Sequence, residues 1–196
     1  MVVRRLLTIL IAAVAIAAAG LGYIYLNRPG PDAPGGIAIG GPIRLTDQNG
    51  AKFDSASLAG KPYGVFFGYT HCPDVCPTTL SDIAQATDAI GDKAKDFTTL
   101  FVTIDPERDT VPVMKDYMSN FTAKAVGLTG TPDEVATAAK AFRVYYKKVP
   151  TSDGGYSMDH TAVLYLMGRH GEFRGVVSYA EDHDAYVQKI KDVLGD

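Results

Sequence analysis

Residues 63–77 read YGVFFGYTHCPDVCP, and this stretch decides the fold class. The apolar run Tyr63–Tyr69 predicts a buried strand, and Pro77 in a first helical turn predicts a helix that ends near Gly91. The only two cysteines of the chain lie at the turn between strand and helix. A helix N-terminus stabilises a thiolate, which is both the nucleophile and the metal ligand, so this turn is the first candidate site.

Outward from this stretch, the pattern alternates between strands and helices. Strands are expected at 43–47, 51–54, 97–104, 125–128, 144–149, 161–167 and 172–178, and helices at 112–120, 132–142 and 182–194. Asn49-Gly50 predicts an N-terminal β-hairpin, and Thr131 opens a capping box with Glu134. Strand–helix–strand units require parallel crossovers, whereas the last two strands form an antiparallel hairpin. The prediction is an α/β fold with a thioredoxin-like mixed sheet flanked by helices, whose chemistry collects at the carboxyl ends of the strands.

Composition and charge exclude one class of partner. The 196 residues are 46% hydrophobic and 21% charged, with a net charge of −3. Only three basic residues, Arg4, Arg5 and Arg28, precede residue 29, so the remainder carries 16 basic against 22 acidic residues. Without a basic stripe, no nucleic-acid partner is expected.

The N-terminus predicts export of the domain. Leu6–Leu26 has no charge and is long enough for a single transmembrane helix, and the arginine balance puts the rest of the chain outside. We therefore expect a membrane anchor at 1–27, a Pro/Gly-rich linker at 28–42 and the globular domain at 43–196. A signal peptide cleaved after Ala17-Ala18-Ala19 is the alternative, and both interpretations export the domain.

The spacing of the cysteine pair allows two kinds of chemistry. Cys72 and Cys76 are four residues apart, which permits either a disulfide or chelation of one metal ion. The usual dithiol redox spacing is one residue shorter, so the pair modestly favours a metal. Two thiolates are too few for structural zinc, but two thiolates with one imidazole suit a trigonal Cu(I) site.

Four histidines compete for the third position. His160 follows the Gly-rich loop 150–159 and precedes an apolar strand, so this loop, expected to be mobile, can carry it onto the site. His71 adjoins a cysteine and is expected to point elsewhere, whereas His170 and His183 are expected at the surface. A local hydrogen bond in the loop is the alternative role of His160.

Two further residues are candidates near this edge. Asp105 ends the strand that follows the cysteine helix, so it is predicted to lie on the same edge as Cys72 and to orient a ligand. A turn or helix-capping role before Pro106 is its alternative. Met158 is soft enough to be a weak axial ligand, but core packing is the preferred interpretation.

Three blocks together resemble the Sco/SenC family: residues 67–77 (FGYTHCPDVCP), 103–110 (TIDPERDT) and 159–161 (DHT). The resemblance implies a membrane-anchored thioredoxin fold that binds copper, as Cu(I) or Cu(II), through Cys72, Cys76 and His160, with Asp105 close by. It also implies Cys72 and Cys76 as a redox-active pair. The implied function is assembly of the CuA centre of cytochrome c oxidase, as a copper metallochaperone, as a reductant of the oxidase cysteines, or as both.

The resemblance also implies partners and a compartment. The partners would be the oxidase subunit that carries CuA and another copper chaperone or thioredoxin-like reductant. The short N-terminus lacks an Arg/Ser-rich transit sequence, which favours a bacterial inner membrane with the domain in the periplasm over a mitochondrial location. Two alternatives stay open: a thiol-disulfide oxidoreductase or peroxidase that uses the cysteine pair, and a redox or copper sensor.

Overall fold

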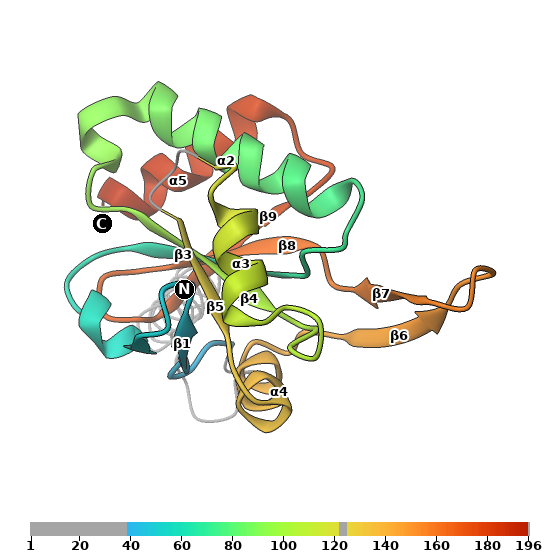
Figure 1. The fold of residues 1–196 in the computed structure, drawn as a ribbon. Helices are drawn as coiled ribbons and strands as arrows, with labels where there is room; N and C mark the ends of the chain where they lie inside the picture. Colours follow the sequence, from blue (N-terminus) through green and yellow to red (C-terminus); the bar gives the residue numbers. More distant parts are fainter. Residues whose placement is uncertain (1–38, 122–124, 196) are drawn as a thin grey trace, which may run out of the picture. The chain divides into compact units, whose positions relative to one another are not determined.

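The computed structural model describes residues 39–121 and 125–195, which belong to one compact unit beginning at Ile39 (Figure 1). The predicted anchor and most of the predicted linker lie outside the described residues. Within the described part of the chain, none of the helices combines the length and apolarity needed to cross a membrane. The predicted β-strands and helices of the domain are present, with their ends shifted by a few residues.

The elements follow one another in the predicted α/β order. The strands are β1 (Arg44–Asp47), β2 (Lys52–Asp54), β3 (Tyr63–Gly68), β4 (Thr98–Thr103), β5 (Ala125–Thr129), β6 (Tyr146–Pro150), β7 (Tyr156–His160), β8 (Val163–Met167) and β9 (Phe173–Ser178). The helices are α2 (Val75–Ile90), α3 (Val111–Met118), α4 (Pro132–Ala141) and α5 (His183–Gly195), with short 3-10 turns at Ser55–Leu58 and Gly91–Ala94.

A seven-stranded mixed sheet forms the centre of the domain. Its strand order is β2-β1-β5-β4-β3-β8-β9, with β3, β4 and β5 parallel and the other pairs antiparallel. Every residue of β3 is buried, because β4 and β8 pair with its two edges and helices cover its faces. This explains why its sequence is an uninterrupted apolar run.

Helices cover both faces of the sheet, as predicted. Figure 1 shows α2 and α5 on one side and α4 on the other. On the first face, two glycines leave room for side chains of the covering helices. A Cβ at Gly68 would lie 2.8 Å from Cys76 Sγ in α2, and one at Gly127 would lie 2.6 Å from Met118 in α3. On the other face, the ring of Phe67 packs 5.4 Å from that of Phe142, which ends α4. The thioredoxin-like layering predicted from the sequence is therefore confirmed.

The prediction of a loop at 150–159 is wrong for the second half of this range. Tyr156–His160 forms strand β7, which pairs with β6 in a separate two-stranded sheet, and Tyr146 lies opposite His160. This hairpin projects from the rest of the domain in Figure 1. Its turn contains Gly154 in the left-handed region at φ 84°, a conformation that favours glycine. His160 is therefore held by a strand and not by an irregular loop.

Helix α2 begins at Val75, so Pro77 lies in its first turn, as predicted. Asp74 is its N-cap residue and Val75 its first helical residue, so Cys76 lies inside the helix and Cys72 just before it. Pro77 is tolerated because the N–H groups of the first turn have no partner within the helix.

Candidate metal centre

The cysteine loop is anchored by a buried carboxylate at the carboxyl edge of the sheet. Asp109, whose side chain is 0% exposed, accepts hydrogen bonds from the Thr70 backbone N–H at 3.0 Å and the Thr70 hydroxyl at 2.6 Å. It also accepts one from the Thr103 hydroxyl at 2.6 Å, at the end of β4. Hydrogen bonds to a charged acceptor are among the stronger ones, so these three contacts fix the chain entering the cysteine loop against β4.

The two sulfurs differ in their surroundings. Cys76 lies in the first turn of α2 and is 0% exposed, whereas Cys72 is half-buried at the helix N-terminus. The Cys76 backbone N–H donates to Cys72 Sγ at 3.4 Å, so this sulfur occupies the place of a capping acceptor. Both cysteines are free thiols here, and the loop brings them together without a disulfide.

This arrangement polarises the pair. A hydrogen bond from the Cys76 thiol lowers the pKa of Cys72 to about 4, against the opposing effect of burial. The nearby His160 and then the backbone N–H groups of Asp74 and Cys76 act in the same direction. The same hydrogen bond, then burial and the nearby Cys72 charge, raise the pKa of Cys76 well above its usual range. At neutral pH the pair therefore shares one proton, with the thiolate on Cys72 and the thiol on Cys76.

His160, the last residue of β7, completes the group. Its Nε2 lies 3.8 Å from Cys76 Sγ, and its Nδ1 lies 3.0 Å from the Thr161 carbonyl oxygen. A carbonyl only accepts, so Nδ1 carries the proton, and Nε2 keeps the lone pair with which it can bind a metal ion. The ring also meets Tyr69 edge-to-face at 5.9 Å between centroids, which fixes its plane.

The donor atoms of Cys72, Cys76 and His160 all lie within 4.8 Å of one another. Among residues 39–121 and 125–195, this is the one group of three cysteine, histidine or acidic side chains close enough to hold a metal ion. Two soft sulfurs and a neutral imidazole form a donor set that suits Cu(I). The arrangement can thus bind a soft, low-coordinate metal ion at the predicted position.

The other histidines lie away from this group, as predicted. His71 Nδ1 lies 3.1 Å from the Thr70 hydroxyl and 3.8 Å from the buried Asp109 carboxylate, and its side chain is half exposed. His170 and His183 are both exposed.

Asp105 is buried beside the hairpin that carries His160. Its carboxylate pairs with the Arg108 guanidinium and accepts a hydrogen bond from the Tyr156 hydroxyl at 3.0 Å. The predicted influence of Asp105 on the ligands would therefore act through β7, and it stays a prediction. Met158, 6% exposed, packs in the core, in agreement with its preferred interpretation.

Sequence reasoning missed Asp109 and Arg108, although both lie in the quoted block 103–110. Asp109 braces the cysteine loop, and Arg108 connects the end of β4 to β7. The one signal available was a cluster of charges directly after an apolar strand, where side chains at the edge of a parallel sheet gather.

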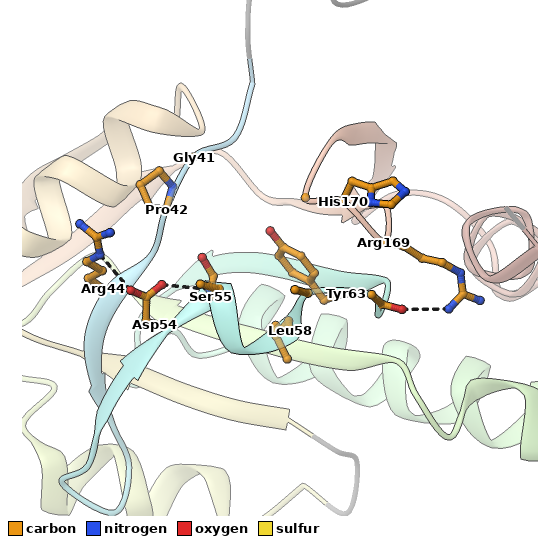
Figure 2. A pocket seen from close by; sticks show the side chains of 13 residues that line it. Gly41, Pro42, Arg44, Asp54, Ser55, Leu58, Tyr63, Arg169 and His170 are labelled. Atoms are coloured by element: carbon orange, nitrogen blue, oxygen red, sulfur yellow. Dashed lines mark hydrogen bonds and ion pairs between the residues drawn. The ribbon is translucent and has the colours of Figure 1, made fainter.

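A cavity of about 460 Å³ lies away from these sulfurs (Figure 2). Its lining includes Arg44, Asp54, Tyr63, Arg169 and His170. Both arginines of this cavity are paired: Arg44 Nε lies 2.9 Å from Asp54, and Arg169 donates to the Gly60 carbonyl oxygen at 3.1 Å. No cysteine is among the residues that line this cavity.

Fold and site together define a thioredoxin-like domain with a Cys-x-x-x-Cys and histidine metal-binding site. The SCO1/SenC family model matches residues 31–195, and the chain belongs to this family.

The domain resembles a structure of Bradyrhizobium japonicum ScoI with copper bound, with 48% sequence identity and a TM-score of 0.73, over 80% of this chain and 99% of that one. Among curated relatives, the human protein SCO1 homolog, mitochondrial, is 44% identical over 138 residues, 69% of this chain. Protein SCO1 homolog 1, mitochondrial, of Arabidopsis thaliana is 41% identical over 158 residues, 80% of this chain. The chain spans about half the length of both relatives, 46% in each case.

Proposed function

We propose that this protein binds one copper ion as cargo through Cys72, Cys76 and His160. The observation that carries the proposal is the convergence of two sulfurs and one imidazole nitrogen within 4.8 Å. The copper bound in the Bradyrhizobium relative, at 48% identity, supports the choice of metal. Cu(I) is the form that this sulfur-rich donor set favours, and Cu(II) is the form to be tested beside it.

The residues of the site have different tasks in capture and release. Cys72, already a thiolate, offers a sulfur without losing a proton, whereas Cys76 must release its proton when it binds the metal. His160 offers Nε2 from a separate hairpin. An incoming thiolate from a partner would enter on the more exposed side, at Cys72, and displace the ligands one at a time.

The destination that we propose is the CuA site of cytochrome c oxidase during its assembly. Membership of the SCO1/SenC family and the three sequence blocks support this role. The partners would be the oxidase subunit that carries CuA and, upstream, another copper chaperone or a thioredoxin-like reductant. The predicted anchor and the bacterial relative support a domain held at a bacterial inner membrane and facing the periplasm.

A second role, reduction of the partner's cysteines, is favoured by the asymmetry of the pair. The half-exposed Cys72 thiolate would attack one sulfur of a partner disulfide, which releases the other sulfur as a thiolate and leaves a mixed disulfide. Cys76, losing its proton, would then attack Cys72 and release the second partner sulfur. The balance is two electrons and one proton from the pair to the partner, a second proton from solvent, and one disulfide between Cys72 and Cys76.

The test is anaerobic loading of the reduced full-length chain with Cu(I), followed by metal stoichiometry and a count of free thiols. One retained copper with both thiols protected is expected. No retained copper, with both thiols free and able to reduce a disulfide, would replace the proposal with a thiol-disulfide oxidoreductase. Retained copper that a CuA-type acceptor does not take up would favour a copper or redox sensor.

A further inference from the structure

Strand β7 turns three side chains toward the body of the domain. Alternation along a strand puts Tyr156, Met158 and His160 on one face. Met158 is buried in the core, and the next residue, Asp159, is exposed. Because these residues share one face of a short strand, whatever fixes the start of the strand also determines where His160 lies at its end.

Arg108 contacts the first residue of this strand in two ways. Its guanidinium carbon lies 3.7 Å from the Tyr156 ring centroid, and its Nη1 donates to the Tyr156 carbonyl oxygen at 2.9 Å. The Tyr156 hydroxyl donates to Asp105 at 3.0 Å, and Asp105 in turn pairs with Arg108. Ring, carbonyl and hydroxyl of Tyr156 are thus all held by the loop that follows β4.

A second tyrosine links these contacts to the cysteine side of the site. Tyr69, between β3 and the cysteine loop, has its ring centroid 5.8 Å from the same guanidinium carbon. The Tyr69 ring also contacts the His160 ring edge-to-face at 5.9 Å. Arg108 therefore lies between one aromatic ring that touches the histidine and another that begins its strand.

We propose that Arg108 and Tyr156 are positioning residues that lock the β6–β7 hairpin and so keep His160 within reach of the two sulfurs. The inference rests on the proposed copper site, because it concerns how firmly the third ligand is held. A two-stranded hairpin is at best marginally stable by itself, and β6 is exposed over four of its five residues. The hairpin therefore depends for its order on contacts with the domain, and the contacts of Tyr156 with Arg108 and Asp105 are among them.

The contacts of Arg108 with Tyr156 depend on the planar shape of the guanidinium as well as on its charge. A planar group can stack on Tyr156 and donate sideways to its carbonyl and to Asp105 at the same time, whereas a lysine ammonium cannot. Lys148 Nζ already lies 4.7 Å from the centroid of the same ring and pairs with Glu107 at 2.7 Å. A positive charge near this ring is thus already supplied by Lys148. Arg108 adds the stacking on the ring and the hydrogen bonds with fixed direction.

Three substitutions separate these contacts in the full-length chain. Arg108→Lys keeps a positive charge beside the buried Asp105 but loses the stack and the fork of donors. Tyr156→Leu keeps apolar bulk and the Asp105–Arg108 pair but loses the ring. Tyr156→Phe keeps the ring and loses only the hydroxyl. Arg44→Lys is the matched control, because Arg44 forms an arginine–aspartate pair at 2.9 Å with Asp54, away from the site.

The first measurement needs no metal: amide hydrogen exchange of residues 156–160 in the reduced protein, with residues 63–68 of β3 as internal reference. Arg108→Lys and Tyr156→Leu are expected to accelerate exchange at least about tenfold in the hairpin and to leave β3 unchanged. Tyr156→Phe is expected to exchange like wild type within about threefold, as is the control. Wild-type exchange of the hairpin in both disruptive variants would overturn the proposal.

The second measurement is transfer of copper from the loaded protein to a Cu(I) chelator. We expect the two disruptive variants to release copper about tenfold to a hundredfold faster, with Tyr156→Phe and the control near the wild-type rate. If the Tyr156→Leu variant loads copper and releases it at the wild-type rate, the contacts of Arg108 with Tyr156 do not control the position of His160, and the proposal is contradicted. If the wild-type protein does not load copper, the proposed function is contradicted instead. Hydrogen exchange alone would then test whether Arg108 and Tyr156 hold the hairpin.

Discussion

The two sheets hold the proposed ligands in opposite ways. Strand β3, which leads into the cysteine loop, is buried at every residue and paired along both edges, whereas β7 belongs to a two-stranded sheet with β6, which is largely exposed. The sulfurs are therefore fixed by the core, and the imidazole is held by a hairpin with few supports of its own. The difference teaches that a binding site can combine a firm pair of ligands with one that is separable, which suits a protein that must also release its metal.

Removing a ligand that the core holds should have the largest effect on copper binding. Cys76→Ser replaces a buried soft sulfur by a hard oxygen, so we expect no copper to be retained against a Cu(I) chelator. Metal stoichiometry after gel filtration measures this. Met158→Leu removes another buried sulfur from the same neighbourhood and is expected to load copper fully. Retention by the Cys76 variant would mean that the core-held pair is not the binding site.

Removing the separable side should weaken binding without ending the thiol chemistry. His160→Ala is expected to lower Cu(I) affinity at least about a hundredfold. Mutation of a residue that merely hydrogen-bonds to a metal ligand already lowers metal affinity about 10- to 100-fold, and here the ligand itself is removed. Reduction of a model disulfide should stay within about twofold of wild type, because both thiols remain. Chelator competition and a disulfide assay measure the two properties.

His71→Ala is the matched control for this contrast. His71 adjoins Cys72, but its ring faces Thr70 and Asp109, so copper affinity is expected to stay at the wild-type value. Equal affinity in the His160 and His71 variants would remove the hairpin from the site and reduce the account to a dithiol.

The polarity of the cysteine pair gives a pH dependence with a defined sign. A pKa of about 4 keeps Cys72 a thiolate above that pH, so its alkylation by iodoacetamide should hardly change between pH 8 and 6 and should halve near pH 4. An unperturbed thiol with a pKa of 9.0 would lose about a hundredfold over the same two units. Peptide mapping should find Cys72 modified and Cys76 protected by burial.

The Cys72→Ala variant sharpens this prediction. With its partner's charge and hydrogen bond gone, Cys76 loses the largest cause of its raised pKa. Its thiol should then ionise at a lower pH than in wild type, although burial still opposes the charge. A hundredfold fall in Cys72 alkylation from pH 8 to 6 in wild type would contradict the shared proton.

The smallest effect is expected where the hairpin meets the sheet. Asp105→Asn keeps the shape and one acceptor oxygen for Tyr156 but removes the charge opposite Arg108, so copper should still load and leave about tenfold faster. Stopped-flow transfer to a chelator measures the rate. A variant with neither altered copper release nor altered thiol reactivity would remove Asp105 from any role at this site.

Much of the domain could be predicted because its signals are local. The uninterrupted apolar residues of β3, the capping box of α4 and the Asn49-Gly50 turn each depend on a few neighbouring residues, and all three are present in the structure. The cysteine pair was evident because no other thiols exist in the chain. Near neighbours therefore carry most of the information about the fold.

The remainder depends on contacts between distant residues. Strand β7 was predicted as loop because two glycines precede it and Ser157 and Asp159 dilute its apolar pattern; its pairing with β6 is what makes it a strand. Asp109 could not be assigned a role because one of its partners, Thr70, lies 39 residues earlier in the chain. A carboxylate after a strand is common, and only the folded chain shows what it holds.

X-ray absorption at the copper edge of the Cu(I)-loaded full-length protein tests the central claim most directly. The account predicts two sulfur neighbours and one imidazole nitrogen in wild type, and the same two sulfurs without the nitrogen in His160→Ala. An unchanged spectrum in that variant, or a wild-type site with sulfur neighbours alone, would contradict a copper site shared between the core-held cysteines and the hairpin histidine.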